Sequence, residues 1–304
     1  MSSTNSQETE SGPGTSTEPL PSLSGVAPAG MDPKIVSLSR RFAEVAQEHR
    51  TGLYMAEDHR YWWNGQGPYP SVTSALKVLH KEAVVQWMAR ETARGAWAHR
   101  LELPSSEEEC VSFLINLPRE KTDTAATLGT DIHRIADLYA RSPQDGLEAF
   151  PLTDVQLSFA KAFLGFLGHY TASEGRDPVI SSEHAVFNLS DGWAGTFDLV
   201  ISIGGENWLI DLKTSKGYYP EYGLQLAAYR HAEFIGLPND PTRYVFPEIH
   251  RTAVLHLRPD AYPDTGWRLV EYPTTDRDYM AFLAALDLWQ WKAEGRFTKK
   301  KLNG

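Results

Sequence analysis

Two short segments of the chain carry acidic and basic side chains at the alternation of β-strands. Asp198 lies in AGTFDLVISI, and Asp211 and Lys213 lie in NWLIDLKT. Side chains two residues apart share one face of a strand, so Asp211 and Lys213 point the same way. Carboxylates bind hard divalent cations, and a neighbouring lysine can orient or deprotonate a water and stabilise charge on a phosphate. The pattern predicts a Mg²⁺ or Mn²⁺ site suited to chemistry on a phosphate.

A hairpin between these segments would bring the charges together. With its turn centred on Gly205 and Glu206, Asp198 faces Lys213, and Asp211 is the diagonal neighbour of Asp198. Diagonal neighbours lie about 7–8 Å apart, so both carboxylates can bind one cation at roughly 2.1 Å. This register predicts one charged face and one apolar face, the latter made of Phe197, Leu199, Ile201, Ile203, Trp208, Ile210 and Leu212.

Two further residues could complete the site. Glu183 lies one strand over, in VISSEHAVFNL, and could add a third carboxylate. His133 follows Gly129 by four residues in a helical segment, so that helix would have to carry its imidazole to the metal. Each element also has an ordinary reading: an isolated Asp-x-Lys usually marks a solvated sheet face, and a lone histidine is more often a surface or capping residue. The shared face of adjacent strands favours the functional reading.

The remaining pattern predicts an α/β fold with a central mixed sheet flanked by helices. Residues 51–69 are aromatic and rich in turn residues, which indicates a β-hairpin, and Ser71 then caps a helix. Helical spacing dominates the first half of the chain, whereas residues 178–214 alternate with period two and predict a three-stranded meander. A helix in GLQLAAYRHAEFIG, a strand in TAVLHL and a final helix in RDYMAFLAALDLWQWKAEG are expected to follow.

Composition excludes several classes of protein. The single cysteine, Cys110, rules out an internal disulfide, a four-cysteine zinc site and an iron–sulfur cluster ligated by this chain alone. No apolar run approaches the roughly 20 residues of a membrane span, and no secretory signal is evident, so a cytoplasmic protein without membrane contact is expected. The net charge of −10 argues against broad coating of nucleic acid, but carboxylates that bind metal also contribute to it.

Five motifs occur in a fixed order along the chain: G-T-D-I-H (129–133), Glu183, A-G-T-F-D (194–198), I-D-L-K-T (210–214) and Q-L-A-A-Y (225–229). Their order and approximate spacing resemble those of the RecB-type branch of the PD-(D/E)xK nucleases. This branch includes the mitochondrial genome maintenance exonuclease, CRISPR-associated RecB-like exonucleases and many phage exonucleases. The segment Y-P-S-V-T-S-A-L (69–76) also looks like the lead-in of the phage and mitochondrial group.

The resemblance implies a restriction-endonuclease-like core and a metal-dependent DNA exonuclease of recombination, repair or replication. It implies metal ligands at Asp198, Asp211 and the Leu212 carbonyl, with His133 and Glu183 added, and a catalytic role for Lys213. Residues implied to contact DNA are Gln225, Tyr229, Thr196 and Thr214. The Pro of the family name is replaced by Phe197, and the cysteines of the iron–sulfur members are absent.

The domain organisation follows the same reading. Residues 1–30 are expected to form a disordered tail, 31–175 a hairpin and helical subdomain that contributes the G-T-x-x-H motif, and 176–304 the nuclease core with the C-terminal helix. DNA is the expected partner, together with a helicase or single-strand annealing protein, in the cytoplasm of the host cell if the chain is phage-encoded. A catalytically silent DNA-end-binding adaptor and an RNA nuclease on the same fold remain alternatives.

Overall fold

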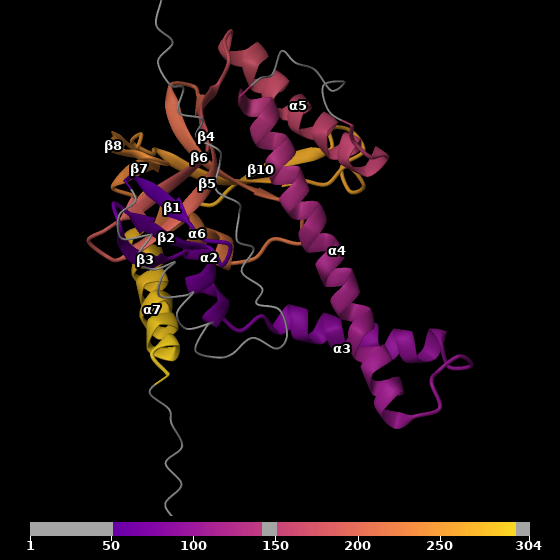
Figure 1. Ribbon diagram of the computed structural model, residues 1–304. Helices are drawn as coiled ribbons and strands as arrows, with labels where there is room; N and C mark the ends of the chain where they lie inside the picture. Colours follow the sequence, from indigo (N-terminus) through magenta and orange to yellow (C-terminus); the bar gives the residue numbers. More distant parts are fainter. Residues whose placement is uncertain (1–50, 142–150, 296–304) are drawn as a thin grey trace, which may run out of the picture. The chain divides into compact units, whose positions relative to one another are not determined.

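A seven-stranded mixed sheet flanked by helices and a three-stranded sheet packed against it make up an α/β fold (Figure 1). The computed structural model describes residues 51–141 and 151–295. The predicted tail at residues 1–30 lies outside the described residues. The α/β class and the mixed sheet flanked by helices are confirmed.

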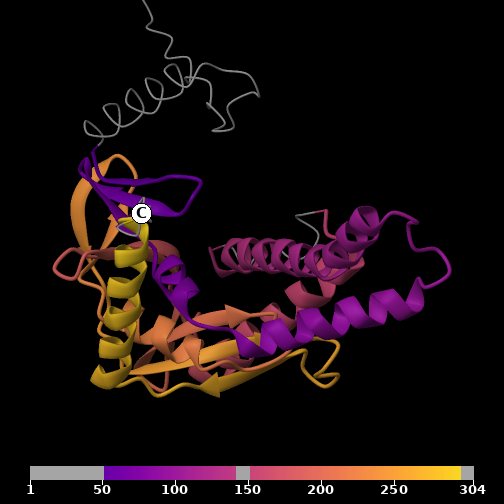
Figure 2. The ribbon, with the colours of Figure 1, turned by 90° about the horizontal axis from the view of Figure 1, so that it is seen from below.

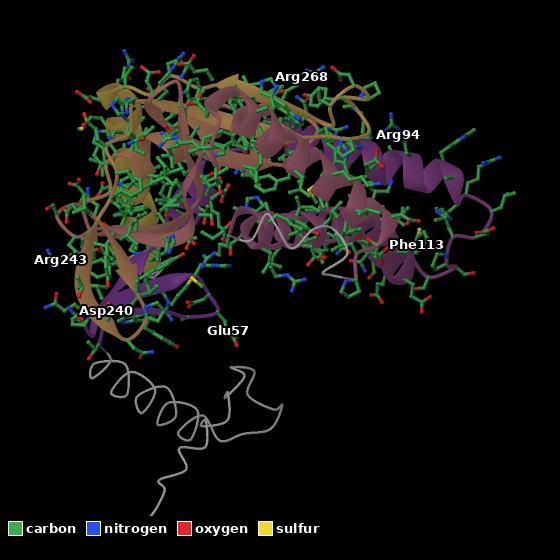
Figure 3. All side chains as sticks on the ribbon, turned by 90° about the horizontal axis from the view of Figure 1, so that it is seen from above. Glu57, Arg94, Phe113, Asp240, Arg243 and Arg268 are labelled. Atoms are coloured by element: carbon green, nitrogen blue, oxygen red, sulfur yellow. The ribbon has the colours of Figure 1, made fainter. Side chains whose placement is uncertain are left out.

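The large sheet has the strand order β10-β9-β6-β5-β4-β7-β8. Strands β4 to β6 form the predicted antiparallel meander, and β9, the predicted strand TAVLHL, pairs in parallel with β6. Strand β8 lies at one edge, where Asp240 and Arg243 are labelled in Figure 3. The strands are β4 (Val179–Asn188), β5 (Trp193–Ile203), β6 (Glu206–Lys213), β7 (Phe234–Leu237), β8 (Asp240–Val245), β9 (Arg251–Leu257) and β10 (Trp267–Glu271).

The register of the β5–β6 hairpin differs from the predicted one by two residues. Ile203 pairs with Glu206, and the two-residue turn consists of Gly204 and Gly205, with φ angles of 60° and 80°. Two consecutive positive φ angles match a type I′ turn, whose twist suits a hairpin and which strongly favours glycine. A shift of two residues does not by itself exchange the two faces of a strand. Continued by one pair beyond Leu199 and Ile210, this register brings Asp198 opposite Asp211.

Helices cover both faces of the large sheet. Against one face pack α4 (Glu107–Arg141) and α5 (Asp154–Glu174), and against the other pack α2 (Val72–Ala75), α6 (Glu221–Arg230) and α7 (Asp276–Ala293). The predicted cap at Ser71 is confirmed, since its Oγ accepts the Ser74 N–H at 3.0 Å. The 3-10 helix Leu76–Val78 follows α2, and helix α3 (Glu82–Ala98) comes next in the chain and packs against α4.

The prediction of one apolar and one charged face is wrong. Leu209 shares the face of Asp211, yet it is fully buried in the cluster formed with α6 and α7. Phe197 also belongs to that cluster, whereas Leu199 and Ile201 pack with α4 and α5. Because helices cover both faces, the charged groups occupy one end of an otherwise apolar sheet rather than a solvated surface.

The aromatic N-terminal segment forms three strands instead of the predicted hairpin: β1 (Leu53–Met55), β2 (Arg60–Trp63) and β3 (Gln66–Pro70). Tyr61 and Trp63 are 3% and 1% exposed and pack against Phe187 and Phe234 of the large sheet. These rings therefore belong to the core between the small and the large sheet. Burial leaves these rings no free face for a nucleobase.

Two helical predictions change in their extent. The segments ECVSFLINL and LGTDIHRIADLYA belong to one 35-residue helix, α4, which contains Pro118 and packs against α3 near its N-terminus (Figure 2). The predicted helix GLQLAAYRHAEFIG ends at Arg230, and Phe234–Leu237 forms β7. Among the described residues, no helix is long and apolar enough to span a membrane.

Candidate metal centre

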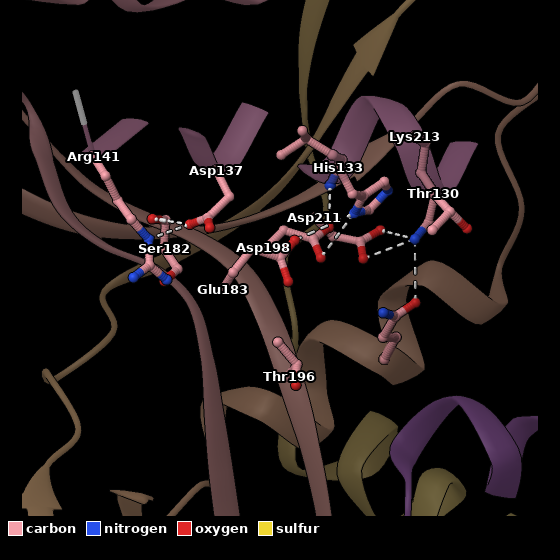
Figure 4. A network of polar contacts seen from close by, with 12 residues as sticks. Thr130, His133, Asp137, Arg141, Ser182, Glu183, Thr196, Asp198, Asp211 and Lys213 are labelled. Atoms are coloured by element: carbon pink, nitrogen blue, oxygen red, sulfur yellow. Dashed lines mark hydrogen bonds and ion pairs between the residues drawn. The ribbon is translucent and has the colours of Figure 1, made fainter. Parts of the chain in front are cut away.

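The end of the β5–β6 pair holds Asp198 in a fixed orientation. Its Oδ2 accepts the backbone N–H of Leu212 at 2.6 Å, and its side chain is 9% exposed. The contact ties the first strand of the pair to the second where their ladder ends (Figure 4). The remaining oxygen, Oδ1, is directed toward His133.

Glu183 reaches the same place through a local distortion of β4. Its φ angle is 45°, a left-handed conformation that costs a residue with a Cβ on the order of 1–3 kcal/mol. The β4–β5 ladder pairs Ser182 with Leu199 and His184 with Phe197, and the pair between them, Glu183 with Asp198, is interrupted. The strand is therefore distorted where the two acids meet, which is typical of functional sites.

Helix α4 brings His133 to the two carboxylates. Its Nδ1 lies 3.2 Å from Asp198 Oδ1 and 3.6 Å from Glu183 Oε1. One ligand atom from each of these three residues lies within 4.8 Å of the others, which is close enough to surround a single cation. Gly129 lies one turn earlier on the helix, where a Cβ would approach Thr214 Oγ1 to 3.5 Å, so the helix packs closely on the chain that follows β6.

Lys213 and Asp211 form a buried ion pair beside this cluster. The Lys213 ammonium donates to Asp211 Oδ1 at 2.8 Å and to Gln225 Oε1 at 3.4 Å, and it lies 5.0 Å from the centre of the Tyr222 ring. Oδ2 of Asp211 is buried and lies 2.6 Å from the same nitrogen, so both carboxylate oxygens face the ammonium.

Electrostatics couple the members of the cluster. Burial alone would lower the pKa of His133, but the carboxylates of Asp198 and Glu183 raise it to about 10. Burial alone would raise the pKa of Asp198, but His133, Lys213 and the Leu212 N–H hold it below its usual value. Burial raises the pKa of Glu183. The imidazole therefore carries a proton at neutral pH in the metal-free protein.

Burial and neighbouring charges also shift the pKa values of Asp211 and Lys213. Burial raises the pKa of Asp211 to about 6, and the attraction of Lys213 offsets this only in part. Burial alone would lower the pKa of Lys213, but the carboxylates of Asp211 and Asp198 raise it. Lys213 is thus an ammonium at neutral pH and serves as a donor.

The structure separates the predicted site residues into two groups. His133, Glu183 and Asp198 converge, while Asp211 pairs with Lys213 one step away, and Leu212 contributes its N–H to Asp198. A metal-ligand role for the Leu212 carbonyl and for Asp211 stays a prediction.

The four residues predicted to contact DNA also make contacts within the protein. Gln225 is 8% exposed and accepts a hydrogen bond from the Lys213 ammonium. Tyr229 is 3% exposed, and its ring lies against Gly195. Thr196 bonds the Tyr61 hydroxyl at 3.1 Å, and Thr214 lies near Gly129. These contacts brace the site, and contact of any of the four with DNA stays a prediction.

A second polar group extends from the cluster along α4 and was not anticipated from the sequence. Asp137, one turn after His133, accepts hydrogen bonds from Ser182 Oγ and from Arg141 Nε, both at 2.7 Å (Figure 4). Arg141 also donates to the Ser182 carbonyl at 3.2 Å. His133, Asp137 and Arg141 are spaced four residues apart, which places them on one face of the helix. This spacing is the sequence feature from which the polar group could have been predicted. These bonds fasten α4 to β4 next to Glu183.

Gly195 provides a stability test of the A-G-T motif. A Cβ at this position would lie 2.7 Å from Cε1 of Tyr229, so Gly195→Ala is expected to destabilise the fold by about 1–3 kcal/mol through overpacking. Gly168→Ala, at an exposed position of α5 with no atom within 4 Å of the new methyl group, should instead stabilise by about 1 kcal/mol. Urea denaturation of both variants measures the difference, and equal stability of Gly195→Ala and the wild type would contradict the close approach of Tyr229.

Comparisons with known proteins add little to this geometry. No family model matches the chain, and no curated protein matches it. Among solved structures, the chain is similar to one described as the crystal structure of SSO0001, with 16% sequence identity and a TM-score of 0.25. The match covers 57% of this chain and 85% of that chain.

Proposed function

We propose that this chain is a metal-dependent nuclease that hydrolyses phosphodiester bonds of DNA from an end, on a restriction-endonuclease-like core. The observation that carries the proposal is the convergence of His133, Glu183 and Asp198 within 4.8 Å, beside the buried pair of Asp211 and Lys213. The ordered motifs of the RecB-type branch support the same reading.

The donor set fits a hard divalent cation. Two carboxylates and one imidazole suit Mg²⁺ or Mn²⁺, with Mn²⁺ the more tolerant of a nitrogen ligand. A bound cation would supply Lewis-acid activation of the phosphate and of a water nucleophile.

Lys213 supplies the remaining polar chemistry. Because its carboxylate neighbours raise its pKa, it acts as an ammonium that orients the attacking water or donates to a phosphate oxygen as negative charge develops. Asp211 and Gln225 hold that ammonium in place. In the reaction, the water oxygen bonds to phosphorus, the bond from phosphorus to the leaving sugar oxygen breaks, and that oxygen takes up a proton.

Dependence on ends is tested with covalently closed and linearised DNA of the same sequence, incubated in parallel with Mg²⁺ or Mn²⁺. We expect linear DNA to shorten progressively while closed circles resist, because relatives with this motif pattern are exonucleases. Equal degradation of both forms would mean an endonuclease. Digestion of RNA but not DNA would favour the RNA nuclease, and binding of ends without cleavage would favour the silent adaptor.

Metal binding is expected to release a proton at pH 7.5. A metal binds the neutral imidazole. The pKa of His133, raised to about 10, keeps the ring protonated at pH 7.5 in the metal-free protein, so this proton must leave when the metal binds. Affinity for Mn²⁺ should therefore fall as the pH is lowered. Calorimetric titration with Mn²⁺ in two buffers of different ionisation enthalpy measures the release, and His133→Gln should diminish it. A binding enthalpy that is the same in both buffers would contradict this expectation.

The partner and location inferred from the resemblance stay predictions. These are DNA, a helicase or single-strand annealing protein, and the cytoplasm.

A further inference from the structure

The loop that follows Lys213 begins beside the metal cluster. Thr214 Oγ1 lies 3.5 Å from where a Cβ on Gly129 would stand, one helical turn before His133. The loop runs from there to Pro220, which precedes α6. The loop therefore starts next to the turn of α4 that precedes His133.

A buried histidine fixes this loop. His256 is 2% exposed, its Nε2 contacts the Ser215 carbonyl, and its Nδ1 lies 2.7 Å from the Tyr262 hydroxyl. A carbonyl can only accept, so Nε2 carries the hydrogen and Nδ1 accepts from Tyr262. Ser215 Oγ donates to the Gly217 carbonyl at 2.9 Å and accepts the Tyr222 hydroxyl at 2.9 Å. These bonds define the course of the loop.

The fixed loop presents Tyr218 with much of its ring open to solvent. Tyr218 is 43% exposed, although its ring packs on His256 with centroids 4.6 Å apart and its hydroxyl lies 2.9 Å from that of Tyr262. Since the Tyr262 hydroxyl donates to His256, Tyr218 donates to Tyr262. The guanidinium of Arg268, labelled in Figure 3, lies 4.6 Å from the Tyr262 ring centre. An exposed aromatic ring held by a tilted ring contact at 56° and by its hydroxyl is ordered before any ligand arrives.

We propose that Tyr218 is a stacking platform for a nucleobase of the strand whose phosphate occupies the metal centre. This inference rests on the proposed function and adds a contact with single-stranded nucleic acid. His256 pairs with Lys213 across adjacent parallel strands, which lie about 4.8 Å apart. The contact between the rings of Tyr218 and His256 therefore holds Tyr218 beside the strand next to that of Lys213. Stacking on one ring tolerates any base, as a nuclease without sequence preference requires.

The test measures binding of fluorescein-labelled single-stranded DNA by anisotropy, with Ca²⁺ present and full-length DNA recovered afterwards. Tyr218→Ala is expected to weaken binding about tenfold, whereas Tyr218→Phe keeps the ring and should stay within about twofold of the wild type. Tyr244→Ala is the matched control, because Tyr244 is 41% exposed on β8, at the edge of the sheet. It should bind as the wild type does.

Oligonucleotides with one abasic site, moved along the strand, identify the base. An abasic site at one position should weaken binding by the wild type about tenfold. The same abasic site should cause no further loss in Tyr218→Ala, because the variant already lacks the ring that contacts this base. Equal binding by the wild type and Tyr218→Ala, absence of a sensitive position, or a fully additive loss would overturn the platform and leave the nuclease proposal standing. Failure of the wild type to bind or cleave any nucleic acid would overturn both.

Discussion

Asp198→Asn is expected to lower metal-dependent cleavage at least about 100-fold while the protein stays folded. The amide keeps an oxygen that can accept the Leu212 N–H, so the contact between β5 and β6 survives. It loses the negative charge that faces His133 and Glu183 and that would bind the cation. Initial rates on linear DNA, with Mn²⁺ affinity measured by calorimetry, check both parts of this expectation.

Asp287→Asn serves as the control for this change, because Asp287 is an exposed acid on α7. It should cleave at the wild-type rate. Near-normal cleavage by Asp198→Asn in a folded protein would remove Asp198 from the proposed metal centre.

Lys213→Ala should also abolish most cleavage, but with a different signature. Removing the ammonium takes away the donor for the water or phosphate, so kcat is expected to fall about 100- to 1,000-fold. Metal affinity should hold or increase, because a cation no longer competes for the carboxylate of Asp211. Turnover and Mn²⁺ affinity, measured on the same preparation, separate a catalytic lysine from one that only supports the metal site.

Lys161→Ala is the matched control, since Lys161 is an exposed lysine on α5, outside the site and outside the loop that follows Lys213. Its turnover should equal that of the wild type. If Lys213→Ala lost metal binding and turnover together, or lost neither, the proposed role of Lys213 would be wrong.

The strands of the site could be predicted from the sequence because period-two alternation is a local signal. It located the meander and set Asp198 and Asp211 on one face. The register was missed by two residues, since the Gly204–Gly205 pair closes a tighter turn than the one assumed. The shift changed the predicted neighbours, because Asp198 was expected opposite Lys213 and the observed register, continued by one pair, puts it opposite Asp211.

Burial on both faces could not be predicted from the same pattern. Leu209 and Asp211 lie two residues apart and share one face of β6. Only the packing of α6 and α7 against that face covers it. The left-handed backbone of Glu183 is likewise a tertiary feature, because no local preference of glutamate favours it.

The helix-borne half of the site depends on contacts distant in sequence. The G-T-D-I-H motif suggested His133, but its approach to Asp198 is set by a 35-residue helix packed on α5 and the sheet. Tyr218 gave no signal at all, since its exposure and anchoring follow from His256, which lies 38 positions later in the chain. Spacing within a motif carries no information about such contacts.

The most direct test of the account is the release of nucleotides from end-labelled linear DNA by the wild type and Asp198→Asn, each with Mn²⁺, Mg²⁺ or EDTA. The metal centre predicts release by the wild type with either metal, none in EDTA, and at least about 100-fold less by Asp198→Asn. Cleavage that persists in EDTA or in the variant, or no cleavage of DNA by the wild type with either metal, would contradict it.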